Sequence, residues 1–512
     1  MIAAASAPGQ AREATEPLSP MARYGVVDVG SNSVRLVVFD GVARAPAYFY
    51  NEKVLCGLGA GLRETGCLNP DGRRRALAAL HRFVALAGRM KLGGLTGVAT
   101  AAVREAADGA EFCAEVGRET GLELTVASGE EEARLSAQGV LLGWPHANGI
   151  VSDMGGSSME LARLDEGRIG DRATSPLGPL TLSDLHGGEA GRNEFIGRTI
   201  AKLRGRFSGP VNRLFLVGGS WRAIARLDME RRRYPLKVLH EYEMPASDIL
   251  ETIDWIAGQT GEDLSARTDT SMARLSLVPA AAPVLAALVR YFEPAHISVS
   301  SYGIREGLLY EKMPPDLRAR DPLLEAARHM EEAYARFPGF GDALYNWLLP
   351  IYRDEPDEEM RLILAACRLH DITWRTHPDY RAEMCFESVT RANVSGVDHL
   401  GRVFLGVAIL KRYKNGDHAG VAGVLKELLP PERFREAETL GKAMRLGAML
   451  SGAVGRSLRD TTLEKRGAEL VLTLCGPAVE LAGEVVERRL ASLAANLKLA
   501  PRMVLEEGRP DR

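Results

Sequence analysis

The stretch VVDVGSNSVRL, residues 26–36, decides the fold of this chain, and VSDMGGSSMEL, residues 151–161, repeats its design. In both, an apolar run typical of a buried strand ends on an aspartate, Asp28 or Asp153, and a turn of Gly, Ser and Asn follows at once. The pattern predicts two β-hairpins, with strands over 24–29 and 34–39 in the first and over 149–154 and 159–164 in the second.

Turns of this kind expose backbone N–H groups that can cradle phosphate oxygens, while the aspartate can hold a divalent cation against them. One such hairpin is more typical of an ordinary chain reversal. The matched pair, and a third glycine turn after an apolar strand in LFLVGGSWRAI, favour a phosphate site gripped from two sides. No Gly-Lys-Ser/Thr follows either turn, so a P-loop is not predicted.

Length and composition favour a globular chain of about three domains, with 512 residues of which 46% are hydrophobic. The Ala- and Pro-rich residues 1–20 are typical of a disordered tail and lack the basic start and apolar core of a signal peptide. Apolar runs are too short to span a bilayer, so we expect no membrane insertion. Six cysteines without a CxxC pair indicate neither zinc nor disulfides, and we expect a cytoplasmic protein.

The net charge of −3 suggests no nucleic-acid partner, but charge is unevenly distributed. Between Arg198 and Lys237 the chain carries eleven basic residues and two acidic ones. Such a run is often a solvated helix face. In a protein with a phosphate-binding cleft it could also draw in a polyanionic tail, for which Arg231, Arg232 and Arg233 are candidates.

The segments from residue 24 to 310 resemble the exopolyphosphatase and guanosine pentaphosphate phosphohydrolase family. The resemblance rests on ordered motifs: VDVGSNSVRL, GVATAAVREA, SGEEEARLSAQGV, SDMGGSSMEL, SPLGPLTL, LVGGSWRAIA, HEYEM, ARLSLVPAAAPVL and SVSSYGIREGLLY. It implies an α/β protein with two ribonuclease-H-like domains of the actin and sugar-kinase superfamily, over 21–145 and 146–312, with the active site between them. It also implies hydrolysis of a terminal phosphoanhydride, with inorganic polyphosphate or guanosine pentaphosphate as substrate.

The segment SGEEEARLSAQGV contains the candidate catalytic residue. Ser128 and Glu131 predict a capping box, and acids in the first turn favour the helix dipole. The family's catalytic glutamate matches Glu132, which suits a base that deprotonates water. Arg104 matches its phosphate-binding arginine, and Arg274 falls at a basic position that could contact a polyphosphate tail.

A phosphoryl group in transfer needs donors and a cation. We expect the carboxylates Asp28, Asp153 and Glu160 to hold Mg²⁺ directly or through water. The expected phosphate donors are Gly30, Ser31, Asn32, Ser33, Gly155, Gly156, Ser157, Ser158, Gly218, Gly219 and Ser220. Three positions depart from the family pattern: Ser157 replaces a usual glycine, Thr181 an arginine and Ser276 an aspartate.

The character of the chain changes after about residue 313, where a Pro-rich junction leads into mostly helical patterns. We predict an all-α domain over 313–512, and its His370-Asp371 pair resembles the HD-like domain of longer family members. A metal site would need further ligands, and His329 and Asp398 are the nearest options without being placed convincingly. A degenerate, structural HD-like domain is therefore the favoured interpretation.

Two other classes of protein compete with a hydrolase. An actin-like kinase or ATPase would need an adenosine pocket, which the sequence does not identify. A polyphosphate or alarmone sensor without turnover would have no reason to place Glu132 and Asp153 beside a polyanion. We further expect a homodimer.

Overall fold

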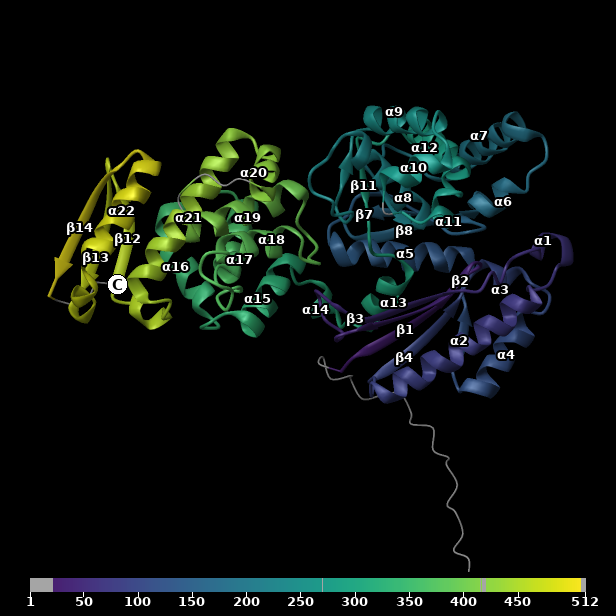
Figure 1. Cartoon of the computed structure of the whole chain (residues 1–512), viewed down its shortest axis with the longest axis horizontal. Helices are drawn as coiled ribbons and strands as arrows, with labels where there is room; N and C mark the ends of the chain where they lie inside the picture. Colours follow the sequence, from purple (N-terminus) through teal and green to yellow (C-terminus); the bar gives the residue numbers. More distant parts are fainter. Residues whose placement is uncertain (1–21, 269, 415, 417–419, 508–512) are drawn as a thin grey trace, which may run out of the picture.

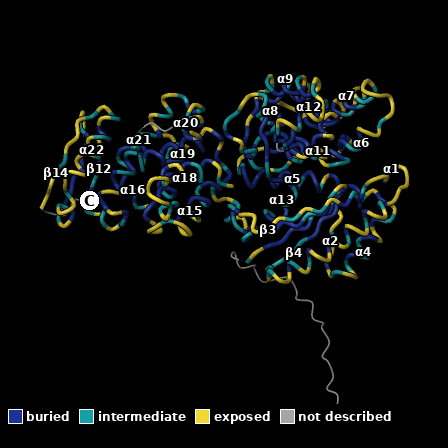
Figure 2. The backbone as a smooth tube through the Cα atoms, viewed as in Figure 1, coloured by how far each residue is buried: buried dark blue, intermediate teal, exposed yellow. Residues whose placement is uncertain are grey.

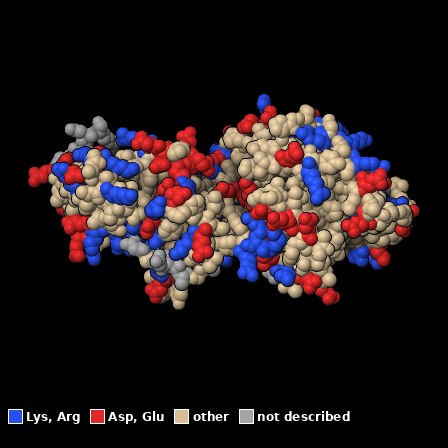
Figure 3. Space-filling view, turned by 90° about the horizontal axis from the view of Figure 1, so that it is seen from above, with Lys and Arg blue, Asp and Glu red and all other residues tan. Residues whose placement is uncertain are grey.

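The computed structural model describes residues 22–268, 270–414, 416 and 420–507, so the predicted disordered tail lies outside the described residues. The described residues form three β-sheets and their covering helices, in an elongated molecule whose C-terminal part lies at one end (Figure 1). None of the described helices combines the length and the apolar character that a membrane span requires. Figure 3 shows acidic and basic side chains interspersed over one face, in keeping with the small net charge.

The first sheet has the strand order β3-β2-β1-β4-β5, in which β2 and β3 pair antiparallel and β4 and β5 parallel. Its strands are β1 Tyr24–Val29, β2 Ser33–Phe39, β3 Tyr48–Leu55, β4 Gly94–Ala99 and β5 Leu124–Val126, with helices α1 Leu62–Thr65, α2 Pro70–Arg89, α3 Ala101–Glu105 and α4 Gly109–Thr120. β1 is buried on both faces, as its continuous Val-rich run predicts. The predicted first hairpin is thereby confirmed.

The second sheet repeats this arrangement with an added edge strand, in the order β10-β11-β9-β6-β7-β8. Its hairpin strands agree with the prediction to within one residue. The strands are β6 Gly149–Met154, β7 Met159–Asp165, β8 Arg168–Ser175, β9 Arg213–Gly218, β10 Glu243–Met244 and β11 His296–Val299. The helices are α6 Pro179–Ser183, α7 Gly188–Arg206, α8 Gly219–Arg231, α9 Ala246–Ala257, α10 Gly261–Arg267, α11 Met272–Leu275 and α12 Val278–Phe292.

Two helices, α5 Gly129–Gly143 and α13 Ile304–Lys312, lie between the two sheets and set their spacing. α5 is buried along most of its length (Figure 2). The helices cross at glycines, because a Cβ on Gly307 would lie 1.9 Å from the Leu135 carbonyl oxygen and one on Gly139 would lie 2.3 Å from that of Gly303. No larger residue fits this crossing.

The prediction of an all-α C-terminal domain is wrong. Between residues 315 and 451 the described residues form helices and their connections, but a three-stranded sheet follows, formed by β12 Thr461–Arg466, β13 Glu469–Cys475 and β14 Ala500–Glu506 and packed on α22 Glu484–Leu497. Two signals were missed: the alternation in TTLEKR, where Leu463 is buried, and the nearly continuous apolar run in ELVLTLC, which is buried on both faces.

The helices of this part are α14 Pro315–Arg318, α15 Pro322–Tyr334, α16 Phe340–Tyr352, α17 Asp357–Leu369, α18 Arg381–Thr390, α19 His399–Tyr413, α20 Val421–Leu425 and α21 Pro431–Ser451. Short 3₁₀ turns lie at Lys426–Leu428, Gly455–Leu458 and Gly476–Leu481. Their shared apolar core continues into the small sheet. The helical residues and the small sheet therefore form one packed unit.

The glycine crossing of α5 and α13 can be tested by stability measurements. Gly307→Ala should lower the free energy of unfolding by about 1–3 kcal/mol, because the added methyl group overpacks a closed contact. Gly117→Ala in α4, where a Cβ meets nothing within 4 Å, should instead raise it by about 0.5–1 kcal/mol through helix propensity. Urea unfolding of both variants measures the difference, and a Gly307→Ala protein as stable as the parent would contradict the account.

Candidate active site

The two predicted hairpins face each other and touch. Their turns are built alike: the Gly30 N–H donates to the Ser33 carbonyl at 3.0 Å, and the Gly155 N–H donates to the Ser158 carbonyl at 3.0 Å. The Ser157 hydroxyl then donates to the Ser31 hydroxyl at 3.3 Å, across the gap between the sheets. A phosphate between the turns would meet N–H groups from both sides.

Both turns line one open cavity of about 540 Å³ between the two sheets, which the third glycine turn also lines. Gly218 adopts a φ of 112°, and a Cβ there would lie 2.5 Å from the Met154 carbonyl oxygen, so only glycine fits beside the second hairpin. The N-terminus of the 13-residue helix α8 follows at Gly219 and Ser220. Its unpaired N–H groups and dipole add to the anion-binding character of the cavity.

Thr181, at a position where the resemblance implies an arginine, braces the second turn. Its hydroxyl donates to the Ser157 carbonyl oxygen at 2.8 Å. Thr181 therefore supports the backbone of the turn that contacts Ser31.

Four carboxylates line the same cavity: Asp28, Glu132, Asp153 and Glu160. β-sheet register places Asp28 opposite Arg35 in the first hairpin and Asp153 opposite Glu160 in the second. The hairpins are thus matched in length and aspartate position but carry opposite charges on their return strands. The second hairpin is therefore the more acidic of the two.

Burial raises the pKa of Glu132 to about 7, against the lowering effect of Arg104, and the nearby charges of Asp153 and Asp28 raise it further. Burial likewise raises the pKa of Asp28 and of Asp153, whose carboxylate accepts a hydrogen bond from Ser136. The pKa of Glu160 is raised well above its usual range by burial and by Glu132. Carboxylates crowded in this way favour binding of a cation.

Glu132 is held where a base is needed. It lies in the first turn of α5 with 5% exposure, and its carboxylate is hydrogen bonded to Arg104, which also donates to the Ala127 carbonyl oxygen at 2.7 Å. Ser128 caps the helix as predicted, but the capping box is incomplete because Glu131 turns to Arg134 instead. Of the three adjacent glutamates, Glu132 is the one that lines the cavity.

Five cations surround the cavity without an ion-pair partner among the residues that the structure describes. They are Arg35, Lys53, Arg222, Arg274 and Arg305. Burial, and then the neighbouring charges of Arg305 and Arg222, lower the pKa of Arg35 to about 10. Such a cluster is stabilised when a polyanion binds.

Sequence reasoning singled out only Arg274 of these five as a site residue. Arg35 and Lys53 lie on the neighbouring strands β2 and β3 of the first sheet. Arg305 lies in α13, after strand β11 of the second sheet and 270 positions after Arg35 in the sequence. The register of the first hairpin is the signal that could have found Arg35, since pairing places it opposite Asp28.

The structure does not bring the predicted tail group Arg231, Arg232 and Arg233 to the cavity. They lie at the far end of α8, roughly 18 Å from Gly219 along the helix axis. Arg231 pairs with Glu251 at 3.1 Å, and Arg232 with Asp248 at 3.2 Å. Arg274, the fourth residue expected to contact a polyphosphate tail, does line the cavity.

The His370-Asp371 pair is buried in the C-terminal core. His370 Nδ1 lies 2.8 Å from the Cys367 carbonyl oxygen, and Asp371 is held by Arg336 and by the Tyr413 hydroxyl at 2.9 Å. His329 is exposed, and Asp398 caps α19 by accepting from the Gly401 N–H. In the described part of the chain no three His, Cys, Asp or Glu side chains form a compact metal-binding group, here or in the cavity.

Comparison with known proteins agrees with this site. The C-terminal residues 324–502 match the description "Exopolyphosphatase, C-terminal". The chain is 26% identical over 314 residues to exopolyphosphatase 1 of Mycobacterium bovis, covering 57% of this chain and 88% of that protein. It is 26% identical over 487 residues to a guanosine-5'-triphosphate,3'-diphosphate pyrophosphatase of Vibrio cholerae, covering 88% and 92%.

Solved structures share the fold of the two-sheet part. The Aquifex aeolicus member of the Ppx/GppA family aligns with a TM-score of 0.51 at 24% identity, over 57% of this chain and 97% of that one. An exopolyphosphatase of Cytophaga hutchinsonii aligns with a TM-score of 0.51 at 22% identity, over 56% and 96%. Residues 37–316 match the Ppx/GppA phosphatase family, to which this chain belongs.

Proposed function

We propose that this protein is an exopolyphosphatase that releases orthophosphate from the end of inorganic polyphosphate. The observation that carries the proposal is the contact of the two N–H-rich turns at Ser31 and Ser157, above one cavity that holds Glu132 and five unpaired cations. The named relatives of the chain act on phosphoanhydrides, which supports the same reaction class.

In the proposed reaction Glu132 orients a water molecule and takes its proton as the water oxygen attacks the terminal phosphorus. A new P–O bond forms, the bridging anhydride bond breaks, and its electron pair goes to the shortened chain. Backbone N–H groups of both turns and the guanidinium groups of Arg35, Arg222 and Arg305 stabilise the charge on the transferred group. Orthophosphate and a chain shorter by one phosphate are the products.

We further propose that Mg²⁺ is the cofactor, held by Asp28, Asp153 and Glu160 directly or through water. Oxygen ligands suit this hard cation, which keeps several of its waters and needs few direct carboxylates. Among the described residues no three His, Cys, Asp or Glu side chains form a compact group, so waters and phosphate oxygens would have to complete the shell of the cation. When bound, the cation would neutralise charge on the phosphoryl oxygens.

Guanosine pentaphosphate is the second candidate substrate, because the match to the Vibrio cholerae pyrophosphatase extends over 88% of the chain. No aromatic side chain lines the cavity in the described residues, so it offers no ring on which a guanine or an adenine would stack. This favours the polymer, and it also argues against a kinase or ATPase. Relative kcat/KM values for the two substrates decide between them.

The repeated strand order of the two sheets supports the interpretation of ribonuclease-H-like domains in the actin and sugar-kinase superfamily. For the C-terminal part we retain the proposal of a degenerate HD-like domain, because Arg336 and Tyr413 already engage Asp371. The sheet that follows it is additional to that domain. A homodimer in the cytoplasm completes the proposal.

Replacement of the base should separate chemistry from binding. Glu132→Gln should lower kcat by roughly 10² to 10⁴ fold while leaving substrate affinity largely intact, because an amide cannot accept the proton. Glu131→Gln is the matched control, since its side chain points to Arg134 and its loss should leave kcat unchanged. A Glu132→Gln enzyme with more than about a third of parental turnover would contradict the role.

The raised pKa of Glu132 predicts that the rate of hydrolysis falls at acid pH. The base must be ionised, so kcat/KM should be full above the pKa near 7 and fall as the pH drops below it. Arg104 lowers this pKa, so Arg104→Gln should shift the fall to higher pH. A rate that does not change between pH 6 and 8 would show that Glu132 does not titrate as the base.

The metal assignment predicts a changed magnesium requirement. Asp153→Asn, and more weakly Asp28→Asn, should raise the Mg²⁺ concentration for half-maximal rate, because each removes a negative charge from the shell of the cation. Asp165→Asn, at the exposed far end of β7, is the control. Equal requirements in all four proteins would refute the assignment.

Two arginines of one helix test which cations hold the substrate. Arg222 lines the cavity at the start of α8, whereas Arg231 lies at its end. Calorimetric titration of the Glu132→Gln protein with tripolyphosphate should show binding weakened at least tenfold by Arg222→Ala and unchanged by Arg231→Ala. Equal losses would place the anion elsewhere.

A further inference from the structure

The motif HEYEM contains two buried polar residues, His240 and Glu241, to which the proposed chemistry assigns no role. They are 4% and 6% exposed, and Glu241 adopts a φ of 64°, in the left-handed region that a glutamate rarely occupies. A residue in this conformation is held there by its surroundings.

On one side His240 contacts the elements that carry the active site. Its Nδ1 accepts a hydrogen bond from the Ser301 N–H at 3.2 Å, and its ring lies 4.5 Å from that of Tyr302 and 5.0 Å from that of Trp144. Trp144 ends α5, the helix that begins with the Glu132 turn. A Cβ on Gly143 would lie 3.1 Å from the His240 ring, so the end of α5 fits closely against it.

The turn that His240 holds belongs to the cavity. Ser301, Gly303 and Arg305 line the cavity, and the Ser301 carbonyl oxygen accepts a hydrogen bond from Arg222 at 3.3 Å. The Ser301 N–H is thus held by His240, and the Ser301 carbonyl oxygen is held by Arg222, which we propose to bind phosphate. A shift of this one peptide would move both Arg222 and the start of α13.

On the other side, Glu241 forms hydrogen bonds to the C-terminal domain. Its Oε1 accepts hydrogen bonds from the N–H groups of Gly396 at 2.6 Å and of Val397 at 3.2 Å. His399 Nε2 lies 3.2 Å from the His240 carbonyl oxygen, so this nitrogen carries the proton and donates. Both contacts join the segment before β10 to the loop that leads into α19.

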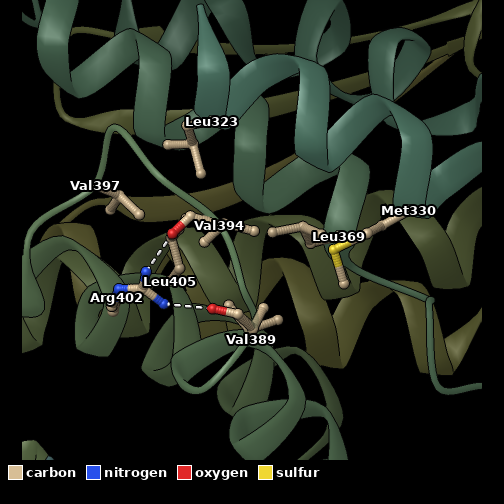
Figure 4. A pocket seen from close by; sticks show the side chains of 9 residues that line it. Leu323, Met330, Leu369, Val389, Val394, Val397, Arg402 and Leu405 are labelled. Carbon is tan, nitrogen blue, oxygen red and sulfur yellow. Dashed lines mark hydrogen bonds between the residues drawn. The ribbon is translucent and has the colours of Figure 1, made fainter. Parts of the chain in front are cut away.

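That loop is itself firmly held. The buried Arg402 donates to the Ala392 carbonyl oxygen at 2.8 Å and to that of Val394, at the edge of a small apolar cavity (Figure 4). The loop therefore has a fixed position within its own domain. Glu241 therefore binds a loop that Arg402 ties to α19.

The hydrogen bond from Ser301 determines which ring nitrogen of His240 carries the proton. Because Nδ1 accepts from Ser301, the proton of the neutral ring is on Nε2. This Nε2 is buried, has no hydrogen-bond partner and lies 3.5 Å from Glu241 Oε1. The imidazole therefore accepts a hydrogen bond on the side of the cavity, and its Nε2 lies near Glu241, which contacts the C-terminal domain, without a hydrogen bond between them.

We propose that His240 is a positioning residue that fixes the Ser301–Arg305 turn of the active site, and that Glu241 makes this position depend on docking of the C-terminal domain. A core histidine with a purely structural role would need no contact with both the catalytic turn and a second domain. The effect on turnover rests on the proposed hydrolase function, whereas the ordering of the turn can be measured without it.

Four variants of the full-length protein test the proposal. His240→Ala removes the acceptor, whereas His240→Asn restores an oxygen that can accept from Ser301. Glu241→Ala cuts the link to Gly396 and Val397. His370→Ala is the matched control, since His370 is equally buried, bonds one backbone carbonyl, has an unpartnered Nε2 and contacts one ring, but lies away from the cavity.

The readouts are kcat and KM for polyphosphate, the melting temperature, and hydrogen exchange of the peptide covering 299–305. His240→Ala and Glu241→Ala should lower kcat about tenfold to a hundredfold, because small misplacements of aligned groups are costly. Both should speed exchange in this peptide, and His240→Asn should recover most of each loss. His370→Ala should lower the melting temperature and leave kcat and exchange at 299–305 unchanged.

Unchanged exchange at 299–305 in His240→Ala would overturn the proposal, as would equal losses of kcat in His240→Ala and His370→Ala at matched loss of stability. Parental exchange in Glu241→Ala would refute the dependence on the C-terminal domain. A parental protein without turnover of polyphosphate would instead refute the proposed function, and the exchange data would still decide the positioning role.

Discussion

The site depends on the burial of Asp28 and Asp153 in one cavity with Glu132 and Glu160. Carboxylates that are removed from water and placed together resist ionisation, and burial raises the pKa of all four. Opposite charge must therefore be supplied from outside this group. Burial also opposes the charge of two cations in the same cavity, because it lowers the pKa of Arg35 and of Arg222. Of the four carboxylates, only Glu132 has an ion-pair partner among the described residues, namely Arg104. Under the proposed function, a metal cation and a polyanion that bind together would complement the remaining charges.

The scaffold places these opposite charges by duplication and close packing. Each sheet contributes a hairpin whose turn is closed by the same backbone hydrogen bond, and α5 and α13 hold the sheets at one spacing through the glycine crossing at Gly139 and Gly307. The contact from Ser157 to Ser31 is the result. Because α5 also carries Glu132, the helix that sets the spacing also aims the proposed base. The C-terminal domain adds a third restraint through Glu241, on the turn that carries Arg305.

Short stretches of the sequence were sufficient to predict the strands, turns and helix starts around the site. The strands around Asp28 and Asp153 and the cap at Ser128 follow from local pattern, because apolar runs, turns and helix starts are encoded within a few residues. Local pattern does not single out Glu132 among its neighbouring glutamates, and its choice rests on the resemblance to the family. Contacts between segments that are distant in the sequence could not be predicted in this way. Arg305 reaches the cavity through the packing of α13 on α5, and charge density alone could not show that Arg222 and Arg231 lie at opposite ends of α8. The C-terminal sheet was missed because its short strands follow a long helical region.

The central claim is that one phosphate chain is held by both turns at once. A crystal structure of the Glu132→Gln protein with tripolyphosphate bound tests it most directly. The account predicts a terminal phosphate that accepts hydrogen bonds from N–H groups of both 30–33 and 155–158, with Arg222 and Arg305 beside it. A phosphate bound to one turn alone, or at Arg231–Arg233, would contradict it.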